Sequence, residues 1–229
     1  MNINDLKKTC PNLKFAEEHY RIYDDFVPDL IHRDDLTVYH PNEYNGQSVI
    51  RLVCSQHPII TEFRAFSDEE LKEIDRLQRR YTDEWIRFLC TEKLPVKEVD
   101  VCSTVNQKVF DALCNQESIE SLRIKYLKCK EINDISKLKN LKKLYLERAS
   151  SLTDISPISL LEHLEVLILG ETTKIHDYSA LKELKKLKVL GICSARTSYN
   201  TVIKAIDINF IEEMPSLEYV DLSDVRLVK

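Results

Sequence analysis

The sequence predicts an α/β fold in which short parallel strands stack into one sheet. Six segments in the second half of the chain place apolar residues at their first, fourth and sixth positions. They are VKEVDV (96–101), IESLRI (119–124), LKKLYL (141–146), LEVLIL (164–169), LKVLGI (187–192) and LEYVDL (217–222). Their starts lie 23, 22, 23, 23 and 30 residues apart. A fixed period of this length is typical of a stacked repeat architecture.

The stretch LKKLYLERASSLTDISPI (141–158) shows how one repeat folds. Alternate side chains of a strand face opposite ways, so Leu144 and Leu146 point into a core. The side chains on the other side of the same strand are expected to face outward: Lys143, Tyr145 and Glu147. After a turn, three further apolar residues return to the core: Leu152, Ile155 and Ile158. Stacked coils of this kind bury a continuous core that no single coil can bury alone.

The segments resemble the leucine-rich repeat family, whose core is LxxLxL. LTDISPI (152–158) resembles the second half of the short repeats of bacterial internalins, and INDIS (132–136) and IHDYS (175–179) are weaker copies. The resemblance covers residues 96–229 and implies a leucine-rich-repeat solenoid of about six coils with a parallel concave sheet and a bacterial source. The asparagine that the family places after its core is replaced here by Ala149, Thr172, Ala195 and Val225.

Two repeats are irregular. VFDALCNQ (109–116) predicts a helix in the first repeat. The fifth repeat is longer, and TVIKAIDINFIEEM (201–214) can form a helix with Val202, Ile206 and Phe210 on one side. The preceding ARTSYN (195–200) is then an enlarged loop beside the concave face.

Residues 1–95 do not repeat and predict a small α+β domain that caps the N-terminal end of the solenoid. The clearest helix covers residues 67–90, where Ser67 and Glu70 form a capping box. One face of this helix is apolar at helical spacing: Leu71, Ile74, Leu77, Tyr81, Trp85 and Phe88. Residues 14–26 predict another helix, and residues 59–66 predict a strand.

Two strands, LTVYH and SVIRLVCS, flank Asn45-Gly46, and this dipeptide is a strong signal for a β-hairpin. At the other end of the chain, only SDVRLVK (223–229) follows the last repeat strand. An exposed edge strand invites pairing with another chain. The sequence therefore predicts a possible homodimer through the C-terminal edge.

Composition bounds the classes of function. The chain has 229 residues, 43% of them hydrophobic, and a net charge of −5. No apolar run is long enough to span a membrane, and no signal peptide is evident, so we expect no membrane partner. Residues 96–229 hold 20 basic and 20 acidic residues, which does not favour nucleic acid. Seven scattered cysteines without a CxxC motif indicate reduced thiols and a cytoplasmic location.

No residue set predicts catalysis, a cofactor or a metal. Gly46, Gly170 and Gly191 are the only glycines and form no phosphate-binding loop. Cys54 and His57 lie three residues apart, with His32 and His40 in the same region, but a zinc site usually needs four ligands in recognisable spacing. Three cysteines are candidate nucleophiles: Cys10, Cys54 and Cys90. A nucleophile also needs a base and an oxyanion site, and the sequence indicates neither. The lysines of residues 137–143 and 181–188 are interpreted as a solvated surface.

The outward strand positions predict a binding surface, because several hold apolar or aromatic residues where solvent favours polar ones. Contiguous apolar surface on a soluble protein usually marks an interaction site. The predicted partner-binding residues are Arg123, Lys125, Lys143, Tyr145, Glu147, Val166, Ile168, Val189, Tyr199, Tyr219 and Asp221. Two other interpretations stay open. The N-terminal domain or the 195–200 loop covers the patch, or the β-branched residues simply suit a parallel sheet.

The sequence thus predicts a non-catalytic protein-binding module that uses the concave face of a solenoid. A bacterial cytosolic adaptor or a toxin-neutralising protein would have these properties. One alternative is an enzyme whose N-terminal domain is catalytic and whose repeats recruit substrate. Another is a structural subunit that assembles through its C-terminal edge. The partner itself is a protein that the sequence does not identify.

Overall fold

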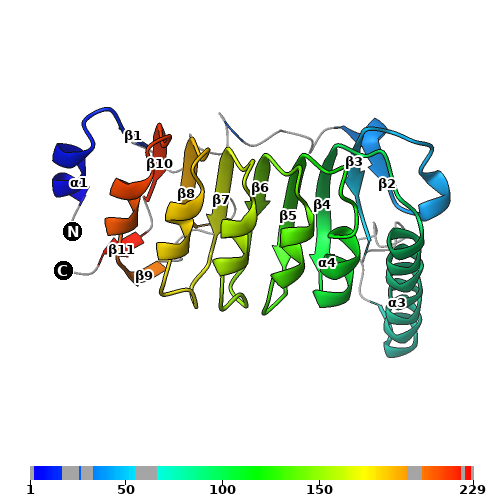
Figure 1. Cartoon of the computed structure of the whole chain (residues 1–229). Coiled ribbons are helices and arrows are strands. Elements are labelled where there is room, and N and C mark those ends of the chain that lie inside the picture. The colour runs from blue at the N-terminus through cyan, green and yellow to red at the C-terminus, as the bar shows by residue number, and fades with distance from the viewer. Residues whose placement is uncertain are drawn as a thin grey trace.

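A computed structural model describes residues 3–16, 26, 33–54, 66–194, 203–222 and 225–227. Strands stack side by side along an elongated molecule (Figure 1). The α-helices are α1 (Ile3–Thr9), α3 (Asp68–Thr91) and α4 (Gln107–Leu113). The strands are β1 (Lys14–Phe15), β2 (Thr37–Val38), β3 (Val49–Leu52), β4 (Glu98–Val105), β5 (Ser121–Leu127), β6 (Lys143–Leu146), β7 (Val166–Gly170), β8 (Val189–Cys193), β9 (Ile203–Ile206), β10 (Tyr219–Asp221) and β11 (Val225–Leu227). The 3₁₀ helices are η1 (Asp34–Leu36), η2 (Pro41–Glu43), η3 (Asn133–Lys137), η4 (Ser156–Leu160), η5 (Ser179–Glu183) and η6 (Asn209–Glu213).

Nine of the described strands form one parallel sheet in the order β1-β10-β8-β7-β6-β5-β4-β3-β2. The six repeated segments supply β4, β5, β6, β7, β8 and β10, as predicted. The sheet also includes β3 and β2, which come from the part of the chain before residue 95. The predicted division of the chain at residue 95 stays a prediction.

The core lies between the sheet and the 3₁₀ helices that return on its convex side. Leu144 and Leu146 have no exposed surface, and neither do Leu152 and Ile158 of the returning wall. Equivalent leucines and isoleucines of neighbouring repeats join them in one cluster. Because each coil packs on the next, this cluster extends along the whole stack of repeats.

An aspartate fixes the turn into three of the 3₁₀ helices. Asp154 accepts a hydrogen bond from the backbone N–H of Ser156 at 2.8 Å, and Asp177 accepts one from Ser179 at 2.8 Å. Asp207 repeats this arrangement with the N–H of Asn209 at 2.9 Å. Aspartate favours such turns because its side chain can bond its own backbone two residues on.

This third turn explains why the helix expected over residues 201–214 is wrong. Ile203–Ile206 form β9, and Asn209–Glu213 form η6. The fifth repeat therefore keeps the returning wall of the other repeats. The helix expected over residues 109–116 is present as α4, which ends at Leu113.

The turns that follow β6 and β7 lack the asparagine that is typical of leucine-rich repeats. Arg148 and Glu171 take left-handed backbone conformations, with φ of 49° and 59°. After them, Ala149 and Thr172 are buried, and the hydroxyl of Thr172 bonds that of Tyr178 at 2.7 Å. Burial raises the pKa of Tyr178 to about 12, so its hydroxyl keeps its proton.

Helix α3 packs beside α4, at the end of the stack that holds β2 and β3 (Figure 1). The predicted role of this helix as a cap stays a prediction. Its capping box joins Ser67 and Glu70 in both directions. Trp85 and Leu89 are buried, and the indole N–H of Trp85 donates to the carbonyl of Tyr39 at 3.0 Å. The predicted apolar face is only partly used, because Leu71 is 50% exposed.

One prediction for the first half of the chain is wrong, and another is wrong at its start. β2 and β3 run parallel, with η2 between them, so Asn45-Gly46 is not the turn of a hairpin. Gly46 does take a positive φ of 92°, which glycine adopts freely. Of the helix expected over residues 14–26, Lys14 and Phe15 form β1 instead, Phe26 is helical, and residues 17–25 lie outside the described residues. Of the strand expected over residues 59–66, only Phe66 is described, and it lies outside any strand.

The C-terminal edge is not exposed, which corrects the premise of the predicted homodimer. Lys14 and Phe15 of β1 pair in parallel with Tyr219 and Val220 of β10. Figure 1 shows α1 and β1 at the end of the stack opposite α3. Strands from both halves of the chain therefore lie in the same sheet, and the start of the chain closes its last repeat.

Candidate protein-binding surface

The concave face of the sheet is built from in-register rows of outward side chains. One row, called here the third-position row, takes one residue from each strand. From β4 to β1 it reads Glu98, Ser121, Lys143, Val166, Val189, Tyr219 and Lys14. Because parallel strands lie about 4.8 Å apart, the two lysines lie on the order of 19 Å apart and bracket three apolar or aromatic residues.

A second hydrophobic cluster forms on this face, separate from the core of the repeats. This concave cluster contains Tyr145, Val166, Ile168, Val189 and Cys193. Phe26 and Tyr219 pack against it. The centroids of the Phe26 and Tyr219 rings lie 5.1 Å apart, and the ring planes are tilted by 53°.

The contact with Phe26 also includes a hydrogen bond. The hydroxyl of Tyr145 donates to the backbone carbonyl of Phe26 at 2.6 Å. Burial raises the pKa of the Tyr145 phenol, so the hydroxyl remains a donor at neutral pH. Phe26, from the first half of the chain, therefore occupies a place on the concave face formed by β6, β7, β8 and β10.

The structure corrects the expected exposure of most predicted partner-binding residues. Seven of them are buried where solvent exposure was expected: Arg123, Tyr145, Glu147, Val166, Ile168, Val189 and Asp221. Lys125 and Tyr219 are half-buried, and Lys143 is exposed. Tyr199 lies outside the described residues. The assignment of these residues to a partner stays a prediction.

A sequence signal for this burial exists. The strands VLILG (166–170) and VLGIC (189–193) are continuously apolar, and every residue in them is buried. Parallel strands covered on both faces have this pattern, whereas a half-exposed strand alternates. The interpretation that another part of the chain covers the patch agrees with the contact made by Phe26.

On the side of β6 away from the concave cluster, at β5 and β4, the concave face carries charged residues. The guanidinium Nε of Arg123 lies 2.8 Å from Glu147 Oε1, and its Nη1 lies 3.8 Å from Asp100 Oδ2. All three side chains are buried. Burial opposes the charge on Arg123, but the two carboxylates outweigh this effect and raise the pKa of its guanidinium.

Arg51 of β3 extends this charged group, and sequence reasoning missed it. Its Nε donates to Cys102 Sγ at 2.9 Å, and Cys102 Sγ lies 3.3 Å from Asp100 Oδ2. Burial and the nearby Asp100 raise the pKa of the Cys102 thiol to about 11. Arg51 was missed because its strand was assigned to a hairpin and not to the repeat sheet.

The two lysines of the third-position row differ from the lysines near them. Lys142 pairs with Glu120 at 2.7 Å, and Lys188 pairs with Glu165 at 2.8 Å. Lys14 and Lys143 are exposed and have no ion pair within the described residues. They are therefore free to meet negative charge on a ligand that lies across the row.

The cysteines and histidines weighed as chemical groups have structural partners. Cys54 is buried, its Sγ lies 3.3 Å from the hydroxyl of Ser103, and burial raises the pKa of its thiol to about 11. His40 Nε2 lies 2.6 Å from Glu84 Oε2. His32 and His57 lie outside the described residues. Within the described part of the chain, no three histidine, cysteine or acidic residues gather as a metal site would require.

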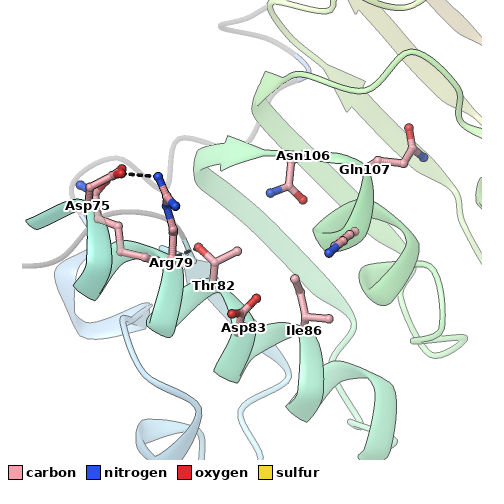
Figure 2. Close-up of a pocket in the computed structure, with 9 residues that line it drawn as sticks. Asp75, Arg79, Thr82, Asp83, Ile86, Asn106 and Gln107 are labelled. Carbon is pink, nitrogen blue, oxygen red and sulfur yellow. Dashed lines mark hydrogen bonds and ion pairs between the residues drawn. The ribbon is translucent and has the colours of Figure 1, made fainter. Parts of the chain in front are cut away.

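A groove of about 500 Å³ separates α3 from the start of α4 (Figure 2). Its lining residues are Asp75, Gln78, Arg79, Thr82, Asp83, Ile86, Asn106, Gln107 and Lys108. Several of their polar groups bond each other or the backbone. Arg79 pairs with Asp75, and the hydroxyl of Thr82 donates to the carbonyl of Gln78.

The repeats and the parallel sheet of this chain define a leucine-rich-repeat fold. Internalin C2 from Listeria monocytogenes is one similar solved structure, with 21% identity, a TM-score of 0.45 and coverage of 64% of this chain and 68% of that chain. Another internalin from the same species has 22% identity, a TM-score of 0.39 and coverage of 58% and 42%.

A plant protein is also similar in structure. The leucine-rich-repeat ectodomain of the receptor kinase GASSHO1/SCHENGEN3 from Arabidopsis thaliana, in complex with CASPARIAN STRIP INTEGRITY FACTOR 2, has 14% identity, a TM-score of 0.43 and coverage of 58% and 16%. No family model and no curated protein matches the sequence. Among the described residues, no helix is both long and apolar enough to cross a membrane.

Proposed function

We propose that this chain is a non-catalytic protein-binding module that docks its partner on the concave face of the repeat sheet. The observation that carries this proposal is the place taken by Phe26. An aromatic side chain and a backbone carbonyl from elsewhere in the chain already bind the concave cluster through Tyr145 and Tyr219. The chemistry that holds this segment is the chemistry that would hold a segment of another protein.

Two further features support the proposal. Aromatic anchors surrounded by charged residues are typical of the residues that dominate binding energy in interfaces. The sheet that displays the cluster is rigid, because its strands pack on a continuous core, and a rigid surface loses little conformational entropy on binding.

We also propose a cytoplasmic location. All seven cysteines are free thiols, and four of them are buried. Free thiols that carry no disulfide suit a reducing compartment. Localisation of a tagged chain in cells tests this proposal, and retention in the cytoplasm is the expected result.

Site-specific photo-crosslinking tests the proposed binding face. A benzoylphenylalanine replaces Lys143, which is exposed on the concave strand β6, or Leu160, which is 55% exposed on the convex side. We expect a partner from the same cells to cross-link at position 143 and not at position 160. Cross-linking at position 160 alone would place the partner on the convex side and refute the proposal.

A further inference from the structure

The contact between Phe26 and the concave cluster consists of two kinds of interaction. It combines one aromatic ring, stacked on Tyr219, with one backbone carbonyl that accepts a hydrogen bond from Tyr145. Both partners come from strands far away in the sequence, β10 and β6. The cluster therefore provides a place for an aromatic residue together with its own backbone.

Charge on both sides of the cluster adds a second requirement. Lys143 precedes the apolar part of the third-position row and Lys14 follows it. Both are exposed and have no ion pair within the described residues. A ligand that lays an aromatic residue on the cluster and extends along the row would bring its flanking residues to these two lysines. Acidic residues at those places would be favoured.

The sequence around Phe26 has this composition. Asp24 and Asp25 precede Phe26, and Asp29 follows it, in the stretch YDDFVPDL (23–30). The chain thus carries one copy of the kind of segment that the face would select: an aromatic residue with acidic neighbours on both sides.

We propose that the concave cluster binds an acidic peptide segment of the partner that carries one aromatic side chain, and that Phe26 competes with it for the same place. This inference rests on the proposed function, because it names the chemistry and the regulation of the same face. A partner binds only those molecules in which Phe26 has left the concave cluster. Its apparent affinity is therefore its intrinsic affinity multiplied by the fraction of such molecules. Removal of Phe26 should therefore tighten binding.

Purified protein and a synthetic peptide test the inference. The probe is a fluorescein-labelled peptide of residues 20–32, YRIYDDFVPDLIH, followed by fluorescence anisotropy. We expect the Phe26→Ala variant to bind it about tenfold more tightly than the wild type, since the competitor is gone. Phe26→Leu, which keeps an apolar side chain but loses the ring that stacks on Tyr219, should bind it between two and five times more tightly, on the same reasoning.

Two altered peptides test the chemistry of the ligand. Replacement of the phenylalanine by alanine removes the ring that stacks on Tyr219. Replacement of the three aspartates by asparagines removes the charge but keeps the shape. We expect either change to weaken binding to Phe26→Ala by about tenfold. The effect of the aspartates should shrink as salt is added, because exposed charges are screened.

A matched pair of charge variants tests the two lysines. Lys14→Glu with Lys143→Glu, made in the Phe26→Ala background, should weaken binding of the acidic peptide by about tenfold. Lys128→Glu with Lys130→Glu makes the same change in net charge at two exposed lysines after β5 and should leave binding unchanged. Circular dichroism confirms that each variant is folded.

The inference is overturned if Phe26→Ala and Phe26→Leu both bind the peptide no more tightly than the wild type. If Phe26→Ala does not fold, Phe26→Leu alone decides. It is also overturned if the Lys14 and Lys143 pair behaves like the Lys128 and Lys130 pair. Neither result affects cross-linking of a partner at position 143, so failure of this inference and failure of the proposed function are distinguishable.

Discussion

Replacement of Arg123 by leucine tests the charged part of the concave face. Arg123 neutralises two buried carboxylates, at 2.8 Å from Glu147 and 3.8 Å from Asp100. Asp100 and Glu147 are 2% and 3% exposed, so water cannot replace the lost guanidinium. Removal of one member of a buried ion pair costs about 3–5 kcal/mol, because the remaining charge is left uncompensated.

Urea unfolding followed by circular dichroism measures this cost. We expect Arg123→Leu to lower the free energy of unfolding by about 3–5 kcal/mol, with little change in the dependence on urea concentration. For a chain of this size the loss lowers Tm by about 6–20 °C. A loss below about 1 kcal/mol would match an exposed ion pair and would refute the reasoning.

Two further variants serve as controls for Arg123→Leu. Arg123→Lys keeps the positive charge and should cost less. Adding Asp100→Asn and Glu147→Gln to Arg123→Leu removes the uncompensated charge and should recover part of the lost stability. No recovery would mean that the leucine side chain acts through packing and not through the loss of charge.

Three further predictions follow from single contacts. Tyr145→Phe should lower the free energy of unfolding by about 1 kcal/mol, because the carbonyl of Phe26 loses its donor; an unchanged urea midpoint would contradict that contact. Hydrogen bonds from two lysines lower the pKa of Glu120 from 4.5 to about 2. The contribution of Glu120 to the stability of the fold is therefore present above about pH 5 and lost as the pH falls toward 2. The difference in unfolding free energy between wild type and Glu120→Gln, measured against pH, should therefore shrink over that window, and a constant difference would argue against the ion pairs. At pH 8, iodoacetamide should modify exposed Cys90 but not buried Cys54, whose thiol has a pKa of about 11; mass spectrometry of the modified peptides checks this, and equal labelling would contradict the burial of Cys54.

The sequence predicts the repeats because their signal is local and recurs. Leu144 and Leu146 alternate with residues on the other face, and the same spacing returns in five more segments. The capping box at Ser67 is also local, since both of its partners lie within one turn of helix. These features need no knowledge of how distant parts of the chain meet.

Two of the errors concern contacts between distant parts of the chain. No local pattern indicates that Lys14 and Phe15 pair with β10, because two residues carry too little periodicity. Asn45-Gly46 gives a hairpin signal, but tertiary packing placed both flanking strands in the parallel sheet. The helix expected over residues 201–214 failed because Asp207 supplies a turn that helical periodicity does not show.

For the candidate site, the residues of the concave face can be predicted from the sequence, but their exposure cannot. The outward strand positions of Val166, Ile168 and Val189 predict free apolar surface, although their place in continuously apolar strands indicates burial on both faces. Phe26 was missed as their partner because 119 residues separate it from Tyr145. Only the fold brings the two together.

Nuclear Overhauser measurements on the free protein test most directly whether Phe26 lies on the concave face. With methyl labelling, we expect cross-peaks between the ring protons of Phe26 and methyl groups of Val166, Ile168 or Val189. Addition of the acidic peptide should weaken these cross-peaks. If the ring shows none of them, and the methyl shifts are the same in wild type and Phe26→Ala, then Phe26 does not occupy the cluster and the account is wrong.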